Sequence, residues 1–63
     1  MSDEELYIVE AMERYGGSFV KQLAKCFYAA DIHNILRLKI AFPEYWEEYS
    51  EFARKDKEKN EKE

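Results

Sequence analysis

The sequence predicts an all-α fold, a small bundle of about four helices that is completed by homodimerisation. Apolar residues recur at the three- and four-residue spacing of a helix face, and no segment alternates apolar and polar residues as a strand does. Helix start and stop signals divide the chain into four stretches. We expect one domain over residues 1–53, followed by a charged, frayed or disordered tail over residues 54–63.

The homodimer is predicted from the small size of the chain. A core built from 63 residues rarely supplies more than about 3–5 kcal/mol of stability. The single cysteine, Cys26, excludes an intrachain disulfide, and the single histidine, His33, excludes a clustered imidazole site. We therefore expect no metal and no cofactor, and we expect a second copy of the chain to cover the remaining apolar surface.

The first helix is expected to begin after Ser2 and to end at a pair of glycines. Ser2 and Glu5 have the spacing of a capping box, in which each side chain bonds the backbone N–H of the other residue. Gly16 and Gly17 then follow, and glycine readily takes the left-handed conformation that closes a helix.

The second and third helices are expected to meet at a short corner. Ser18 is the predicted N-cap of the second helix, and Asp31 that of the third. Cys26 lies at the margin of the apolar arc of the second helix, where we interpret it as a small buried hydrophobe. The third helix is apolar over more than half its circumference, so it is either central or packed on both its own core and a second subunit. Lys39 lies inside this arc, where its stem would cross apolar surface and its amine would reach water.

The fourth helix is expected to begin at Pro43, since proline suits the first position of a helix and disfavours helix in the residue before it. The alternative is one continuous helix that is kinked at Pro43. The stretch after Pro43 has aromatic residues on one face, which we expect to build the core and the subunit contact. The predicted oligomer interface consists of Ile35, Leu38, Phe42, Tyr45, Trp46 and Tyr49.

The opposite face of the fourth helix is a row of carboxylates. It is most simply a solvated face, and it is also the surface where we would look for a protein interaction. None of these glutamates has a histidine three residues later, as the helices of di-iron proteins require. No catalytic, cofactor-binding or metal-binding residue is therefore assigned, and we expect a protein that is not an enzyme. The row consists of Glu44, Glu47, Glu48 and Glu51.

Two alternative functions follow from the distribution of charge. The net charge of −4 opposes binding to nucleic acid, but the basic residues gather in the middle of the chain. The second and third helices could form a helix-turn-helix regulator that contacts DNA. The glutamate row could instead imitate the charge spacing of nucleic acid and inhibit a host protein that binds it. The candidate DNA contacts are Lys21, Lys25, His33, Asn34 and Arg37.

The location is predicted from what the sequence does not contain. It has no stretch of about 18 apolar residues, and it begins Met-Ser-Asp-Glu-Glu without a basic and then apolar leader. We therefore expect a cytoplasmic protein with no membrane partner, which agrees with its free thiol.

Three stretches between residues 14 and 49 form a recognisable set. They are Arg14-Tyr15-Gly16-Gly17-Ser18-Phe19-Val20-Lys21, then Ala30-Asp31 with Asn34, and then Arg37-Leu38 with Ala41-Phe42-Pro43-Glu44-Tyr45-Trp46. In these stretches the chain resembles a group of short uncharacterised proteins encoded by bacteriophages and prophages. The resemblance implies a small accessory protein in the cytoplasm of the bacterial host. It also implies that the protein acts by binding a host or phage protein, through which it would influence phage development. The resemblance supplies no catalytic residues.

Overall fold

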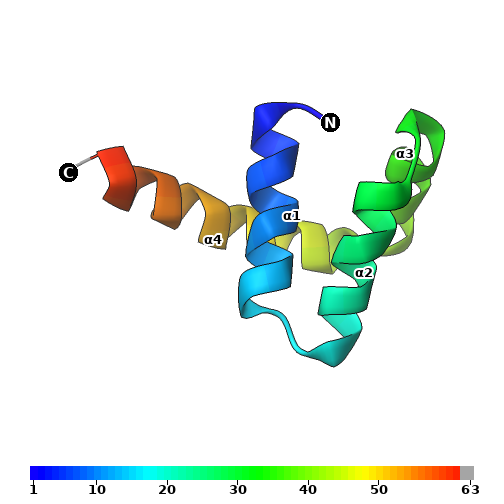
Figure 1. The fold of residues 1–63 in the computed structure, drawn as a ribbon, viewed down its shortest axis with the longest axis horizontal. Coiled ribbons are helices and arrows are strands. Elements are labelled where there is room, and N and C mark those ends of the chain that lie inside the picture. Colours follow the sequence, from blue (N-terminus) through cyan, green and yellow to red (C-terminus); the bar gives the residue numbers. More distant parts are fainter. Residues whose placement is uncertain (62–63) are drawn as a thin grey trace.

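The computed structural model describes residues 1–61, and the side chains of residues 1–56. This part of the chain forms four helices and no strand: α1 (Asp3–Tyr15), α2 (Ser18–Ala29), α3 (Ile32–Ala41) and α4 (Pro43–Glu61). The predicted all-α fold is confirmed. In Figure 1, α1 and α2 run side by side in opposite directions, α3 returns beside α2, and α4 crosses behind α1.

Most of the predicted helix boundaries are confirmed by the capping contacts. The Ser2 Oγ accepts a hydrogen bond from the Glu5 backbone N–H at 3.2 Å, and the Glu5 carboxylate accepts one from the Ser2 N–H at 2.9 Å. The Asp31 carboxylate accepts a bond from the Asn34 N–H at 2.9 Å. α3 ends at Ala41 and α4 begins at Pro43, so the alternative of one continuous kinked helix is wrong.

The turn between α1 and α2 differs from the prediction in two respects. The N-cap of α2 is Gly17, and Ser18 is already the first residue of the helix. Neither glycine is left-handed, since φ is −75° at Gly16 and −76° at Gly17. Gly16 is needed for space instead: a Cβ there would lie 2.5 Å from both the Met12 carbonyl oxygen and the Val20 Cγ1. The first turn of α2 can therefore pack directly on the end of α1.

The core lies between α1, α2 and α4, and α3 adds one buried residue to it, Ile35. The largest completely buried side chains are those of Val9, Met12 and Phe27. The other buried hydrophobic residues are Ala11, Val20, Leu23, Ala24, Tyr49 and Ala53.

The aromatic face of α4 is covered by helices of the same protomer. Trp46 packs on Phe27 of α2, with 5.1 Å between the ring centroids. Further along α4, Phe52 stacks between Tyr49 and Tyr15, at 5.4 and 5.1 Å. The predicted oligomer interface is therefore part of the protomer's own core: Ile35 and Tyr49 are buried, and the half-buried residues packed against them include Leu38, Phe42, Tyr45 and Trp46.

The predicted charged tail over residues 54–63 begins within α4. The helix continues past residue 53 to Glu61, and residues 62–63 lie outside the described part of the chain. The hydroxyl of Tyr15 donates to the carboxylate of Asp56 at 2.9 Å, and a guanidinium nitrogen of Arg14 lies 3.8 Å from the same carboxylate. The last turn of α1 thus holds α4 beyond its apolar part, a contact between distant residues that local sequence does not reveal.

The role of Gly16 predicts a stability difference within the glycine pair. Gly16→Ala should lower the free energy of unfolding by about 1–3 kcal/mol, because the added methyl group forces α1 and α2 apart. Gly17→Ala is the matched control: a Cβ there meets nothing within 4 Å, so the change should stay within about 0.5 kcal/mol. Urea denaturation followed by circular dichroism measures both. Equal losses at the two positions would contradict the packing role of Gly16.

Candidate interaction surface

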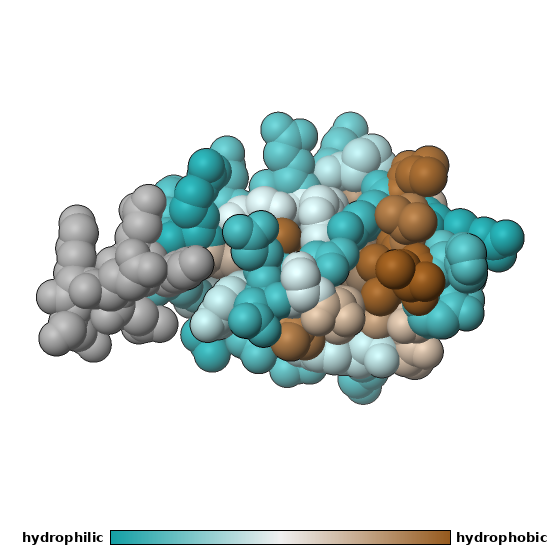
Figure 2. All heavy atoms as spheres, turned by 90° about the horizontal axis from the view of Figure 1, so that it is seen from above, coloured by the Kyte–Doolittle hydropathy of each residue, from teal (hydrophilic) through white to brown (hydrophobic). Residues whose placement is uncertain are grey.

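The main apolar feature on the surface is a row of aliphatic side chains on α3. Ile32, Leu36 and Ile40 are 71%, 52% and 79% exposed. Residues four apart are offset by only about 40° around a helix, so these three form one line along the whole of α3. We call this line the α3 ridge. Figure 2 shows strongly hydrophobic residues gathered at the end of the molecule where α3 lies, opposite the end of α4.

The contacts of Lys39 fix which side of α3 faces outward. Its ammonium lies 2.6 Å from a carboxylate oxygen of Glu5 in α1 and 4.6 Å from the centre of the Trp46 ring in α4. The Lys39 side chain is partly exposed, and its ammonium is bound at the edge of the bundle by an acid of α1 and the face of an aromatic ring. With Lys39 and Ile35 turned inward, the helical geometry turns the α3 ridge outward.

The same contact changes the chemistry of Glu5. The hydrogen bond from Lys39 and the backbone N–H of Ser2 hold the pKa of the Glu5 carboxyl at about 2, below its ordinary value of 4.5. Partial burial acts in the opposite direction and is outweighed. Glu5 therefore caps α1 and anchors α3 with one carboxylate, which remains ionised well into the acid range.

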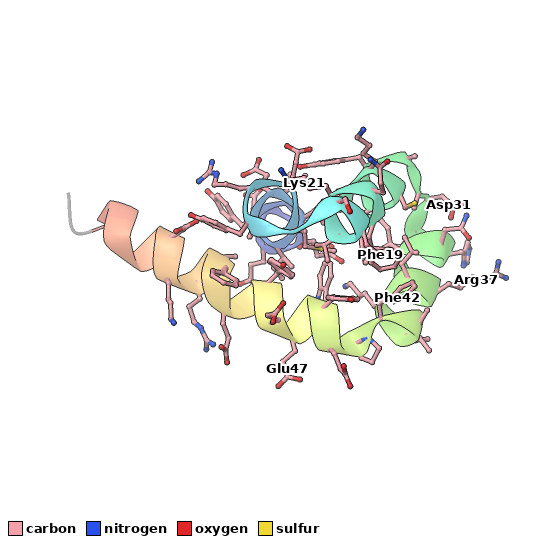
Figure 3. All side chains as sticks on the ribbon, turned by 90° about the horizontal axis from the view of Figure 1, so that it is seen from below. Phe19, Lys21, Asp31, Arg37, Phe42 and Glu47 are labelled. Atoms are coloured by element: carbon pink, nitrogen blue, oxygen red, sulfur yellow. The ribbon has the colours of Figure 1, made fainter. Side chains whose placement is uncertain are left out.

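Charged residues of both signs lie near the α3 ridge, since the acidic Asp31 directly precedes Ile32 and Glu5 is paired with Lys39. Between Ile32 and Ala41, α3 contains two basic residues, Arg37 and Lys39, and no acid. Arg37 is exposed, and in Figure 3 its side chain points away from the body of the molecule. The Asp31 carboxylate at the start of α3 is engaged by the backbone of Asn34. The outer face of α3 thus carries the α3 ridge, with the exposed side chain of Arg37 beside it.

The predicted glutamate surface lies on the outer side of α4. Glu44, Glu47, Glu48 and Glu51 are all exposed, and in Figure 3 Glu47 points away from the other helices. In the same view Glu47 and Arg37 point in different directions. The acidic row of α4 and the α3 ridge are therefore two separate surfaces.

The residues predicted to contact DNA are exposed but not gathered in one place. They are Lys21, Lys25, His33, Asn34 and Arg37. In Figure 3, Lys21 lies over α2 while Arg37 projects from the far end of the molecule. The exposed side of α3 also carries the α3 ridge, whereas a recognition helix presents polar side chains to base edges.

Two surface features were missed or misread from the sequence. Cys26 is exposed, so its interpretation as a buried hydrophobe is wrong. An open groove of about 390 Å³ lies between α1 and α4. It could not be predicted from the sequence, because it depends on how these two helices cross. The hydroxyl of Ser50, at its edge, donates to the backbone carbonyl of Trp46. The groove is lined by Glu4, Tyr7, Ile8, Ser50, Ala53 and Arg54.

Searches of the described residues for two further kinds of site gave negative results. Across residues 1–61, no helix is both long and apolar enough to cross a membrane. The described side chains also bring together no group of three or more histidine, cysteine, aspartate or glutamate residues suited to a metal ion. Comparison with protein-family models, with curated proteins and with solved structures finds no match to this chain.

The lowered pKa of Glu5 predicts acid sensitivity that depends on Lys39. The folded pKa is about 2 and the ordinary value is 4.5. The stabilisation is therefore fully present above pH 4.5 and is lost progressively as the pH falls towards 2. The difference in unfolding free energy between the wild type and Glu5→Gln should shrink over this interval in urea titrations at fixed pH.

Lys39→Met provides the control for the acid sensitivity. Lys39 is the largest cause of the lowered pKa, so Glu5→Gln in the Lys39→Met background should show a much smaller dependence on pH. An unchanged dependence would mean that the capping contact with Ser2, and not the ion pair, controls the titration.

Proposed function

We propose that this chain is a non-enzymatic accessory protein of a phage or prophage that acts in the bacterial cytoplasm by binding another protein through the α3 ridge. The exposure of Ile32, Leu36 and Ile40 in one line is the observation that carries the proposal. The resemblance of residues 14–49 to short phage and prophage proteins supports the cellular setting.

The arrangement of the α3 ridge supports a binding role better than the alternative, in which these residues are exposed without any function. Single aliphatic residues on a surface are common and need no explanation. Here three of them share one face of a ten-residue helix, and the least exposed is still 52% accessible. Complete burial of one such side chain is worth about 1.5–3 kcal/mol, so a partner that covers the α3 ridge gains from all three together.

The α3 ridge offers one surface for the homodimerisation predicted from the sequence. The six residues first assigned to the interface pack against the core of one protomer, and exposing them would open that core. Two intact protomers can meet through Ile32, Leu36 and Ile40 without such a cost. A second copy is thus one partner that the proposal admits, beside a host or phage protein.

The glutamate row of α4 supports a second candidate function, inhibition of a host protein that binds nucleic acid. Glu44, Glu47, Glu48 and Glu51 are exposed on one helix, and in Figure 3 the labelled Glu47 points away from the other helices. A basic nucleic-acid site would be attracted to this face. The two functions use different surfaces, so variants of each surface separate them.

Capture experiments test which surface binds. A tagged Leu36→Gln/Ile40→Gln variant should lose the proteins that the wild type retains from a bacterial lysate, by at least about tenfold in quantitative mass spectrometry, since two apolar contacts are removed. Its fold should be unchanged in circular dichroism because both side chains are exposed. The matched control is Glu47→Gln/Glu48→Gln on α4.

The control decides between the two candidate functions. If the α4 variant loses the captured proteins and the α3 variant keeps them, the inhibitor function replaces binding through the α3 ridge. If both variants retain them equally, neither surface is the binding site. Sedimentation velocity of the wild type and the α3 variant at micromolar concentration shows whether a second copy is among the partners.

A further inference from the structure

We infer that α3 opens locally as a unit while α1, α2 and α4 remain folded, and that the contact of Lys39 with Glu5 and Trp46 holds it closed. The opening would regulate the α3 ridge, and in this respect the inference rests on the proposed function. The opening itself needs no partner. Three observations support it: the small share of the core that α3 supplies, the breaks in the helix at both of its ends, and its short length.

α3 contributes little to the hydrophobic core. Among the side chains that the structure describes, ten hydrophobic residues are buried, and Ile35 alone of these belongs to α3. The ring contacts of Phe27 with Trp46 and of Tyr15 with Phe52 join helices other than α3. Segments that bury few apolar side chains are the ones that open without global unfolding. The other three helices therefore keep most of the core when α3 leaves it.

Non-helical backbone separates α3 from both neighbouring helices. Ala30 and Asp31 are extended before it, with ψ of 143° and 177°, and Phe42 lies at φ −131° and ψ 59° after it. The first backbone bond of α3 runs from the Ile35 N–H to the Asp31 carbonyl. The last runs from the Phe42 N–H to the Leu38 carbonyl. These bonds can break without unwinding α2 or α4.

The length of α3 determines what happens to it outside the bundle. It has ten residues, and an isolated helix shorter than about 12 residues is marginal in water, because too few hydrogen bonds offset the cost of nucleation. Once it leaves the bundle, α3 therefore unfolds instead of persisting as a free helix.

Lys39 attaches α3 to two other helices at once. Its ammonium lies 2.6 Å from the carboxylate of Glu5 in α1 and 4.6 Å from the centre of the Trp46 ring in α4. The Lys39 and Glu5 side chains are only 28% and 25% exposed, so water screens their attraction less than at an open surface. Without this contact, α3 is held mainly by buried Ile35 and half-buried Leu38.

Opening of α3 would remove the α3 ridge. Ile32, Leu36 and Ile40 form one line only while the backbone between them is helical. A partner of the α3 ridge therefore binds the closed state alone and shifts the equilibrium towards it. The Lys39 contact, which favours the same state, sets how readily the binding surface is lost.

Native-state hydrogen exchange of the wild type tests the opening. After correction for intrinsic rates, the amides of residues 36–41 should be at least about tenfold less protected than those of Met12 and Leu23 in the core. Low concentrations of urea should speed exchange in α3 less than in the core, because a local opening exposes less surface than global unfolding. Equal protection and equal urea dependence would overturn the inference, because α3 would then unfold only with the whole protein.

The variant Lys39→Met tests what holds α3 closed. Methionine keeps an unbranched apolar side chain but has no ammonium, so the protection of the amides of residues 36–41 should fall about tenfold. Unchanged protection of these amides would overturn the role of the Lys39 contact.

Phe52→Ala is the matched control. The Phe52 ring stacks on Tyr15 and Tyr49, outside α3, so its contacts remain when α3 opens. The variant should lower the protection of the core amides and leave that of residues 36–41 unchanged. An equal loss in both groups would overturn a separate opening of α3. None of these measurements contains a partner, so their outcome is independent of the capture experiment that tests the proposed function.

Discussion

The contact of Lys39 with Glu5 and Trp46 is the interaction on which the arrangement of the helices depends. One ammonium group joins α3 to α1 through a carboxylate at 2.6 Å and to α4 through an aromatic ring at 4.6 Å. Trp46 in turn packs on Phe27 of α2, so all four helices meet in this one chain of contacts. A partly buried ion pair is costly unless its geometry is good, and the short distance together with the ring provides that geometry.

This contact also explains why the aliphatic side chains of the α3 ridge are exposed to solvent. Lys39 and the α3 ridge lie on adjoining arcs of one short helix, so a rotation that buried Ile32 and Leu36 would move Lys39 towards the middle of the core. The ammonium would then lose its contact with Glu5 and remain as a buried charge without a partner. The desolvation of such a charge lowers the stability of the fold by several kcal/mol. The exposure of the α3 ridge is the smaller cost. The exposed α3 ridge is thus a consequence of how the bundle holds its third helix.

The sequence predicted well most features that depend on near neighbours, the turn at Gly16 and Gly17 excepted. The Ser2 and Glu5 capping box, the Asp31 cap and the Pro43 start each involve residues within four positions, and all are present. It predicted poorly what depends on distant residues. The amine of Lys39 meets an acid 34 positions away, and Asp56 meets Tyr15 across 41 positions. The side of α3 that faces water could not be chosen either, because apolar residues surround most of that helix and its periodicity favours no single face.

The path of the chain leaves the α3 ridge to be covered from outside. α4 begins at the end of α3 and crosses behind α1, so its far end lies at the opposite side of the molecule from α3 (Figure 1). The aromatic face of α4 is a large apolar surface, but it packs on the first two helices. Its partners are Tyr15 of α1 and Phe19 and Phe27 of α2. It therefore does not cover the α3 ridge. Within residues 1–61 no helix remains to pack on the α3 ridge, and the glutamates of α4 named above are exposed. Burial of the apolar α3 ridge would be favourable because it removes apolar surface from water, whereas the carboxylate face of α4 gains nothing of this kind from burial.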